Sequence, residues 1–259
     1  QFTEACRLCR ICVRVCPVGA IWLEEAASET TQDISAYRNV LIVAEQRQGK
    51  LHPVTYELVG KGLELASKLG EQVVVCLGGS RVEHLAEELL HYGIDCVYVY
   101  DYHELSHFRI EPYTAITVHL VERIKPSTIL MGATPIGRSL APRVATRLRT
   151  GLTADCTILD VKENGDLVQI RPAFGGDVMA QIVTPRHRPQ MATVRHKVMI
   201  PAEQVEPKGE IVRCEVDAQL LRSKIEIMKF RPHQVTTSIT DAEIIVAAGR
   251  GLGKPEDLK

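Results

Sequence analysis

Four cysteines near the start of the chain have the spacing of an iron–sulfur site. They are Cys6, Cys9, Cys12 and Cys16, in the pattern C-x2-C-x2-C-x3-C, and Pro17 follows them. Thiolates separated by two residues can wrap a tight loop around one corner of a cubane cluster, and soft thiolate ligands suit iron–sulfur chemistry. Zinc usually takes two separated C-x2-C pairs instead. The run therefore predicts a [4Fe-4S] site that carries electrons.

The number of ligands leaves one assignment open. In two-cluster ferredoxins, the first three cysteines of such a run bind one cluster and the fourth binds the other. By this logic Cys6, Cys9 and Cys12 share a cluster whose fourth ligand lies elsewhere, and Cys16 reaches toward a second cluster. We therefore expect a first half of the ferredoxin-like module upstream of Gln1. The remaining cysteines are expected to be small buried residues rather than ligands: Cys76, Cys96, Cys156 and Cys214.

The composition argues against several other classes of protein. The chain has 259 residues, of which 45% are hydrophobic and 24% charged, and its formal net charge is -1. This near-neutral balance gives no sign of nucleic-acid binding, and no apolar run approaches the ~20 residues of a membrane-spanning helix. Cluster thiolates beside unpaired cysteines indicate a reducing compartment. We therefore expect a cytoplasmic protein without membrane insertion.

After a polar tether at 24–37, the pattern alternates between strands and helices. Short apolar runs of the kind buried in parallel sheets precede segments with helical periodicity. Such alternation implies βαβ units and a Rossmann-like parallel sheet. Strands are expected at 40–44, 73–77, 96–100 and 128–131, and helices at 53–69, around 85–90, at 113–124 and at 137–148.

The pattern changes after Gly151. Asn164 and Gly165 form a strong hairpin signal. Strands are expected on either side of it, at 158–161 and 168–170, and further short strands at 181–183, 191–194 and 211–216. We interpret this half as an antiparallel extension of the α/β core. A linker at 230–240 and a strand at 244–248 then lead into the glycine turn around Arg250.

A second motif with possible chemistry lies at 103–107. His103, Glu104 and His107 match H-E-x-x-H, which can place two histidines on zinc with a glutamate as base. The match directly follows an expected strand, and no third ligand suggests itself. A surface loop is the favoured interpretation.

The loop at 132–139, G-A-T-P-I-G-R-S, resembles the phosphate-binding pattern G-x-x-x-x-G-K-[ST]. Arg138 stands in the place of the lysine, and Pro135 removes one backbone N–H that would cradle phosphate. An adenine-nucleotide hydrolase or ligase that uses this loop is the alternative function. The other interpretation is a glycine-permitted loop at the carboxyl edge of the sheet, where α/β folds place ligands or partners.

Several longer segments together resemble the electron transfer flavoprotein alpha subunit. They are G-A-T-P-I-G-R-S-L-A-P-R at 132–143, L-R-T-G-L-T-A-D-C-T at 148–157, R-P-A-F-G-G at 171–176 and Q-M-A-T-V-R at 190–195. The segment V-A-A-G-R-G-L-G at 246–253 is similar to the first turn of that family's FAD-binding domain. The resemblance covers most of residues 39–253, and the motifs occur in the right order.

The resemblance implies a fold and a set of partners. It implies three parts: a partial ferredoxin-like module and tether at 1–36, an α/β domain at 37–235, and a linker with the beginning of a FAD-binding domain at 236–259. The α/β domain would be a platform for the beta subunit, and Arg250 would contact FAD. The cysteine run is similar to anaerobic members that work with acyl-CoA or lactate dehydrogenases and with ferredoxin, in which a flavin splits an electron pair. A scaffold with an inert cluster is a third hypothesis.

Overall fold

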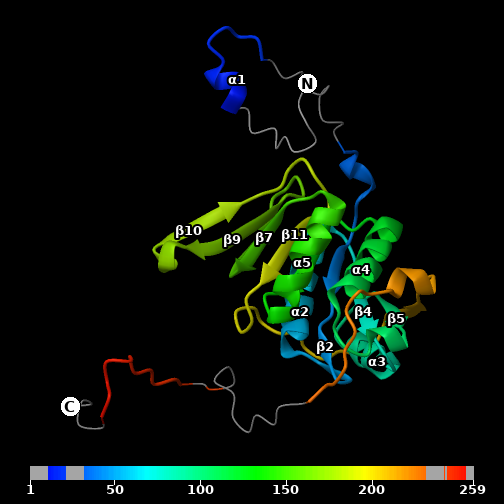
Figure 1. Cartoon of the computed structure of the whole chain (residues 1–259). Coiled ribbons are helices and arrows are strands. Elements are labelled where there is room, and N and C mark those ends of the chain that lie inside the picture. Colours follow the sequence, from blue (N-terminus) through cyan, green and yellow to red (C-terminus); the bar gives the residue numbers. More distant parts are fainter. Residues whose placement is uncertain (1–10, 22–31, 232–241, 243, 255–259) are drawn as a thin grey trace. The chain divides into compact units, whose positions relative to one another are not determined.

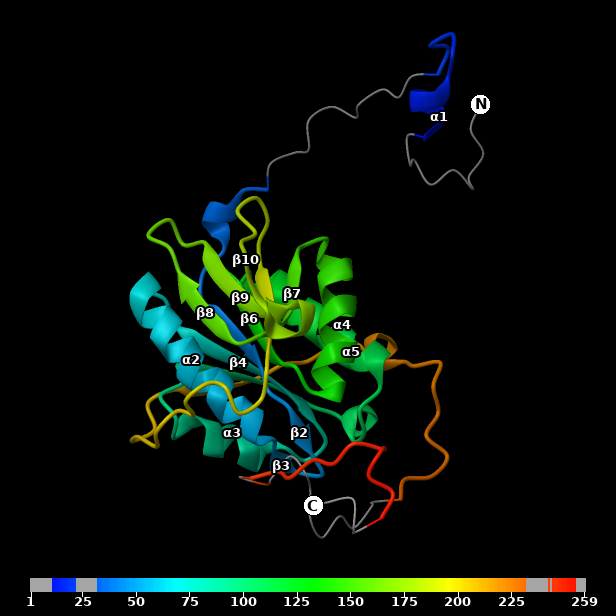
Figure 2. The same ribbon diagram turned by 90° about the vertical axis from the view of Figure 1, so that its left-hand side faces the viewer.

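The computed structural model describes residues 11–21, 32–231, 242 and 244–254. The chain divides into two compact units, residues 1–223 and residues 224–259. In the first unit, helices cover both faces of a parallel sheet (Figures 1 and 2). No helix in the described part of the chain is long and apolar enough to cross a membrane.

Seven parallel strands form the main sheet, in the order β12-β5-β4-β1-β6-β11-β7. The central strand β1 pairs in parallel with both β4 and β6. This confirms the predicted Rossmann-like sheet and its first four strands. The strands are β1 (Val40–Val43), β4 (Val73–Gly79), β5 (Cys96–Asp101), β6 (Thr128–Gly132), β7 (Leu152–Cys156), β11 (Gln190–Val194) and β12 (Glu210–Arg213).

The helices begin and end at residues that favour such boundaries. The His52 side chain accepts a hydrogen bond from the backbone N–H of Val54, Pro53 opens the first turn, and Gly70 closes the helix in the left-handed region at φ 64°. The four predicted helices are α2 (Pro53–Leu69), α3 (Glu83–Leu90), α4 (Ile110–Ile124) and α5 (Pro135–Leu148). Shorter ones are α1 (Ile11–Val15), η1 (Ile34–Ala36), η2 (His103–Leu105), η3 (Phe174–Gly176) and η4 (Ala218–Leu221).

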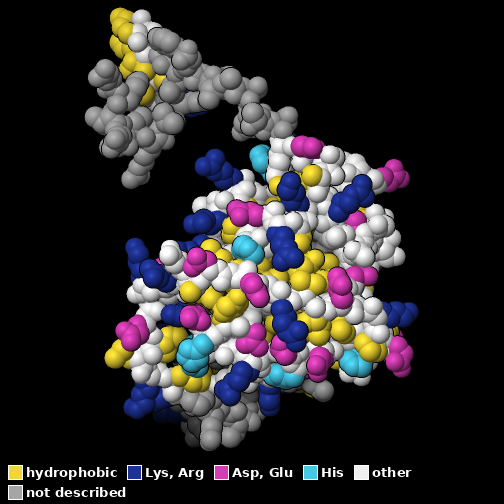
Figure 3. Space-filling view, turned by 90° about the vertical axis from the view of Figure 1, so that its right-hand side faces the viewer, with side chains coloured by type: hydrophobic (Ala, Val, Ile, Leu, Met, Phe, Trp, Pro, Cys, Tyr) yellow, Lys and Arg dark blue, Asp and Glu magenta, His cyan; other side chains and the backbone are white. Residues whose placement is uncertain are grey.

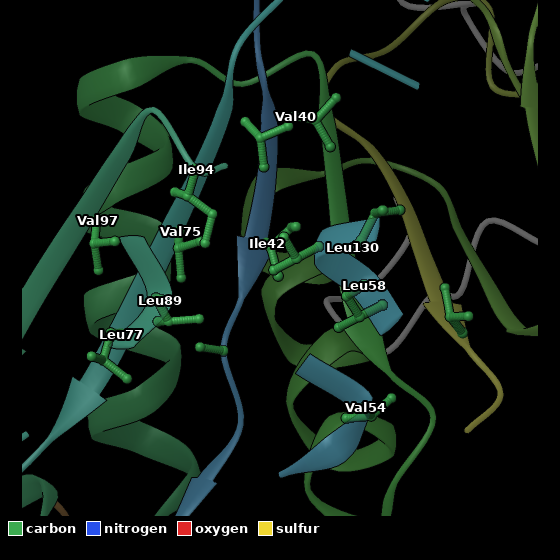
Figure 4. Close-up of a cluster of buried hydrophobic side chains, with 14 of the residues drawn as sticks. Val40, Ile42, Val54, Leu58, Val75, Leu77, Leu89, Ile94, Val97 and Leu130 are labelled. Atoms are coloured by element: carbon green, nitrogen blue, oxygen red, sulfur yellow. The ribbon is translucent and has the colours of Figure 1, made fainter. Parts of the chain in front are cut away.

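Buried apolar side chains lie on both faces of the sheet. On one face, Leu58 of α2 and Leu89 of α3 pack in the same cluster as Ile42 (Figure 4). On the other face, Leu120 of α4 and Val144 of α5 take the same role. Because each parallel strand is buried on both faces, it reads as a continuous apolar run. The scattered cysteines are buried as predicted, and burial raises the pKa of each thiol: Cys76, Cys96, Cys156 and Cys214.

The predicted antiparallel extension is a three-stranded sheet, in the order β10-β9-β8. The hairpin signal is confirmed, because Asn164 accepts a hydrogen bond from the backbone N–H of Asp166 at 3.1 Å and Gly165 lies in the left-handed region at φ 79°. The strands are β8 (Ile158–Val161), β9 (Leu167–Ala173) and β10 (Val178–Ile182). A separate two-stranded hairpin consists of β2 (Gln46–Arg47) and β3 (Lys50–Leu51).

Two strands that we assigned to the extension belong to the parallel sheet instead. β11 lies between β6 and β7, and β12 pairs in parallel with β5 at the opposite edge. All five residues of β11 are buried, as in a central strand of a parallel sheet. The strand β7, which we did not predict, completes this half of the sheet. The strands β7, β11 and β12 run parallel to neighbouring strands that are distant in sequence, so local sequence patterns did not reveal their direction.

The second unit contains none of the predicted strand at 244–248. Residues 244–254 have no regular strand, and the side chains of Ile244 and Val246 are 85% and 94% exposed. A strand requires a neighbour for its backbone N–H and C=O groups, and no described segment pairs with these residues. The predicted strand at 244–248 is therefore wrong.

Candidate functional site

The cysteine segment is described from Ile11 to Ile21. Cys12 lies within α1, and Cys16 follows the end of the helix, where Pro17 prevents its continuation. Cys6 and Cys9 lie outside the described residues. The described part of the chain contains only two of the four predicted ligands. Within it, no group of three or more His, Cys, Asp or Glu side chains could hold a metal ion.

The environment of Cys16 favours a thiolate. Its sulfur accepts a hydrogen bond from the backbone N–H of Ala20 at 3.3 Å, across a turn in which Gly19 adopts φ 62°. Hydrogen bonds from the backbone N–H groups of Val18 and Ala20 lower the pKa of this thiol below its ordinary value. Because cluster ligands are thiolates, the donor chemistry of this turn fits an iron–sulfur cluster. Cys6, Cys9, Cys12 and Cys16 are the residues that would hold it.

Arg250 lies in a glycine turn in the second unit. The backbone N–H of Leu252 donates a hydrogen bond to the carbonyl of Gly249 at 3.0 Å, which closes the turn, and the Arg250 side chain is exposed. A Cβ at Gly249 or Gly251 would meet no atom within 4 Å among the described residues. The backbone is thus open to a ligand, and the role of Arg250 in FAD binding stays a prediction.

At the centre of the sheet, a carboxylate occupies the place where α/β folds usually bind ligands. This is the carboxyl end of β1, where the strand order reverses. The buried Glu45 accepts a hydrogen bond from the hydroxyl of Thr134, and that hydroxyl accepts one from the backbone N–H of Gly137 at 3.1 Å. Arg47 pairs with Glu45 at 2.7 Å. The start of α5 is therefore already capped, and a phosphate there would meet a negative charge.

The space beside this carboxylate is also too small for a nucleotide. The cavity lined by Glu45, Tyr113 and Gly137 has a volume of about 30 Å³, whereas ligand pockets usually have roughly 300–1,000 Å³. A Cβ at Gly137 would come within 1.8 Å of the carbonyl oxygen of Gly132. Gly137 thus permits close packing of α5 against the end of β6, and a Cβ at Gly132 would come within 2.8 Å of the Val54 side chain of α2. The arrangement does not favour the nucleotide hydrolase or ligase.

Four of the family-like segments contribute to a cluster of charges that the sequence analysis did not identify. Asp155, within β7, accepts two hydrogen bonds from the guanidinium of Arg195, at 2.7 and 3.2 Å, and Arg138 of α5 lies 3.5 Å away. The hydrogen bond from Arg195 lowers the pKa of Asp155, and the charges of Arg195, Arg138 and Arg171 act in the same direction. Asp155 itself adopts φ 64°. Because one carboxylate lies among three arginines, the surface around β7 carries a net positive charge.

The tip of the β9–β10 hairpin carries an exposed apolar surface. Phe174 is 86% exposed and adopts φ 50°, which is rare for a bulky residue. Val178 and Met179 of β10 are half exposed beside it. A backbone strained to hold an aromatic ring in water is often found at functional positions. In contrast, the face shown in Figure 3 mixes basic, acidic, histidine and apolar side chains without a large region of one charge.

Two family models match this chain. Residues 40–219 match the electron transfer flavoprotein domain, and residues 2–22 match the 4Fe-4S binding domain. The second match contains the four cysteines of the predicted cluster site.

Named relatives are similar over most of the chain. It is 49% identical over 259 residues to the lactate dehydrogenase (NAD(+),ferredoxin) subunit LctC of Acetobacterium woodii, and covers 62% of that protein. It is 46% identical over 231 residues to protein FixB of Clostridium saccharobutylicum, with 88% of this chain and 68% of the relative covered. It is 44% identical over 222 residues to the electron transfer flavoprotein subunit alpha of Thermoanaerobacterium thermosaccharolyticum, with 85% and 67% covered. The chain thus spans about two thirds of the length of these relatives.

Proposed function

Because the chain belongs to the electron transfer flavoprotein family, we propose that it is the alpha-type part of a flavoprotein complex that transfers electrons. One observation carries the proposal: the chain combines a cysteine segment that favours a thiolate with an α/β unit that has no room for a nucleotide of its own. In that unit, Glu45 occupies the position at the carboxyl end of β1 where a nucleotide would bind. The redox chemistry then belongs to bound cofactors, and the protein supplies binding and orientation. A [4Fe-4S] cluster held by Cys6, Cys9, Cys12 and Cys16 supplies one-electron transfer when bound.

The proposal includes FAD and three protein partners. Arg250 in its glycine turn is the residue of this chain that we assign to FAD, because a guanidinium can pair with two phosphate oxygens where the backbone also comes close. The partners are the beta subunit, a lactate or acyl-CoA dehydrogenase, and ferredoxin. The similarity to LctC, whose name includes lactate dehydrogenase, NAD(+) and ferredoxin, supports the lactate dehydrogenase and ferredoxin as partners. The reaction that we propose is electron bifurcation, in the cytoplasm.

An electron paramagnetic resonance spectrum of the dithionite-reduced chain tests this function. We expect the signal of a low-potential [4Fe-4S] cluster, together with iron and sulfide in similar amounts. A chain that contains zinc in place of iron, or a cluster that dithionite does not reduce, would contradict an electron-transfer role. A nucleotide turnover by the purified chain would favour the hydrolase or ligase instead.

The exposed hairpin tip supports contact with the beta subunit, and Phe174→Ala tests it. An aromatic side chain that is exposed in the free chain and becomes buried in a complex commonly dominates the affinity. We expect Phe174→Ala to weaken binding of the beta subunit about tenfold or more, measured by calorimetric titration of the two subunits. The matched control is Ile200→Ala, since Ile200 is equally exposed at 85% but lies outside the hairpin. Equal losses in both variants would refute a specific role of Phe174.

A further inference from the structure

A second, much larger pocket lies at the carboxyl ends of β4 and β5, outside the site described above. Its volume is about 740 Å³, and three segments line it: the β2–β3 hairpin, the turn after β4, and the segment of η2 with the two residues that follow it. We propose that this pocket binds a small organic phosphate of the sugar phosphate class. The proposal does not depend on the iron–sulfur cluster, on FAD or on the proposed function.

The side chains that line the pocket include several hydrogen-bond donors. They include Arg81, His103 and His107, together with the hydroxyls of Ser80 and Ser106. No carboxylate is among the described residues that line it. Arginine provides forked donors that match phosphate oxygens, and serine and histidine add single donors. The pocket therefore suits an anion better than a cation.

The turn after β4 directs Arg81 by means of a strained backbone. Arg81 adopts φ 58°, a conformation that L side chains rarely take. The carboxylate of Asp101 holds it there by accepting hydrogen bonds from the backbone N–H groups of Arg81 and Val82, at 2.6 and 2.9 Å. These bonds occupy the backbone at the start of α3 but not the Arg81 guanidinium, which is exposed. Strain kept at an exposed arginine indicates a function for that side chain.

The opposite wall is fixed by buried contacts. Leu105, in the middle of the H-E-x-x-H segment, is fully buried, and its carbonyl accepts a hydrogen bond from the hydroxyl of Tyr113 at 2.9 Å. This anchor places His103 and His107 on the same pocket. Glu104 does not line the pocket, and no third metal ligand gathers there among the described residues. The two histidines are therefore better explained as anion donors than as a zinc site.

The third wall favours a polar organic group over a nucleobase. Gln46 is held by a hydrogen bond from its side-chain amide to the carbonyl of Gly78 at 3.2 Å, and His84 contacts the carbonyl of Gly49 at 3.1 Å. The side-chain amide of Gln46 also accepts a hydrogen bond from the backbone N–H of Gly49 at 3.3 Å, and Gln48 presents an amide that can bind hydroxyl groups. No aromatic ring other than the two imidazoles lines the pocket among the described residues, so no large apolar platform can stack on a base. The volume exceeds that of phosphate alone and accommodates a sugar.

Calorimetric titration of the full chain with ribose 5-phosphate and with ribose tests the proposal. We expect binding of ribose 5-phosphate, competition by inorganic phosphate, and no detectable binding of ribose. Arg81→Gln should weaken binding by about tenfold or more, because it removes a charged donor. The double variant His103→Gln/His107→Gln acts from the other wall and should also weaken it. Arg147→Gln, an exposed arginine on α5, is the matched control and should bind like the parent.

Three results would overturn the proposal. The first is no binding of ribose 5-phosphate up to about 10 mM, a concentration that corresponds to less than about 3 kcal/mol of binding free energy. The second is equal affinity in Arg81→Gln, Arg147→Gln and the parent, with all three folded by circular dichroism. The third is binding of Zn²⁺ that is lost in the double histidine variant while ribose 5-phosphate does not bind.

Discussion

Cys9→Ser is expected to remove nearly all iron from the chain, whereas Cys16→Ser should retain most of it. Cys9 stands in the middle of the three cysteines that we assign to one cluster. A serine hydroxyl is a hard ligand that does not replace a thiolate on iron. Cys16 lies directly after α1 and before Pro17, in a turn with its own backbone N–H donors. Iron and sulfide analysis of both variants, purified without oxygen, measures the difference.

The control for this experiment is Cys214→Ser, which replaces a buried thiol far from the run in sequence. Cys214 is 3% exposed and packs in the α/β core, so its iron content should equal that of the parent. Equal iron loss in Cys9→Ser and Cys16→Ser would show that all four cysteines hold one local cluster. In that case our division of the run between two clusters is wrong.

The parts of the fold that local patterns specify could be predicted from the sequence. The helix at 53–69 was predicted to the residue, because Pro53 and Gly70 mark its ends. The hairpin at Asn164 followed from its turn residues alone. The position of β11 in the sheet could not be predicted in this way. Polar and apolar residues alternate too little in Q-M-A-T-V to show whether one face of the strand is buried or both. Parallel pairing is decided by contacts with β6, about 60 residues earlier in the chain, and no local signal encodes them.

The candidate site divides in the same way. The cysteine spacing is local, and the match of residues 2–22 to a 4Fe-4S binding domain confirms that interpretation. The contact of Glu45 with Thr134 joins residues 89 positions apart, so the sequence alone did not show that the fold closes the loop at 132–139. Asp155 stood in a segment that we quoted for the family resemblance, but its pairing with Arg195 depends on β7 lying beside β11. The order of the sheet was therefore the missing information.

Asp166→Asn is expected to destabilise the α/β unit by about 3–5 kcal/mol, the usual cost of leaving one charge of a buried ion pair uncompensated. Asp166 pairs with Arg188 at 3.0 Å, and the two side chains are 8% and 5% exposed. Arg188 in turn exchanges two hydrogen bonds with Gln32, at 2.7 and 3.0 Å, through its backbone. The pair thus holds the loop before β11 and the residues where the tether joins the α/β unit.

Urea unfolding monitored by circular dichroism measures this effect, and two variants make it specific. Asp160→Asn breaks the exposed pair with Lys68, whose side chains are 54% and 45% exposed, and should cost less than about 1 kcal/mol. Asp166→Leu/Arg188→Met removes both charges and should recover much of the loss, because no buried charge is then left alone. If Asp166→Asn costs no more than Asp160→Asn, water reaches Arg188 in solution. The anchoring of Gln32 would then depend on its own hydrogen bonds and not on the ion pair beneath them.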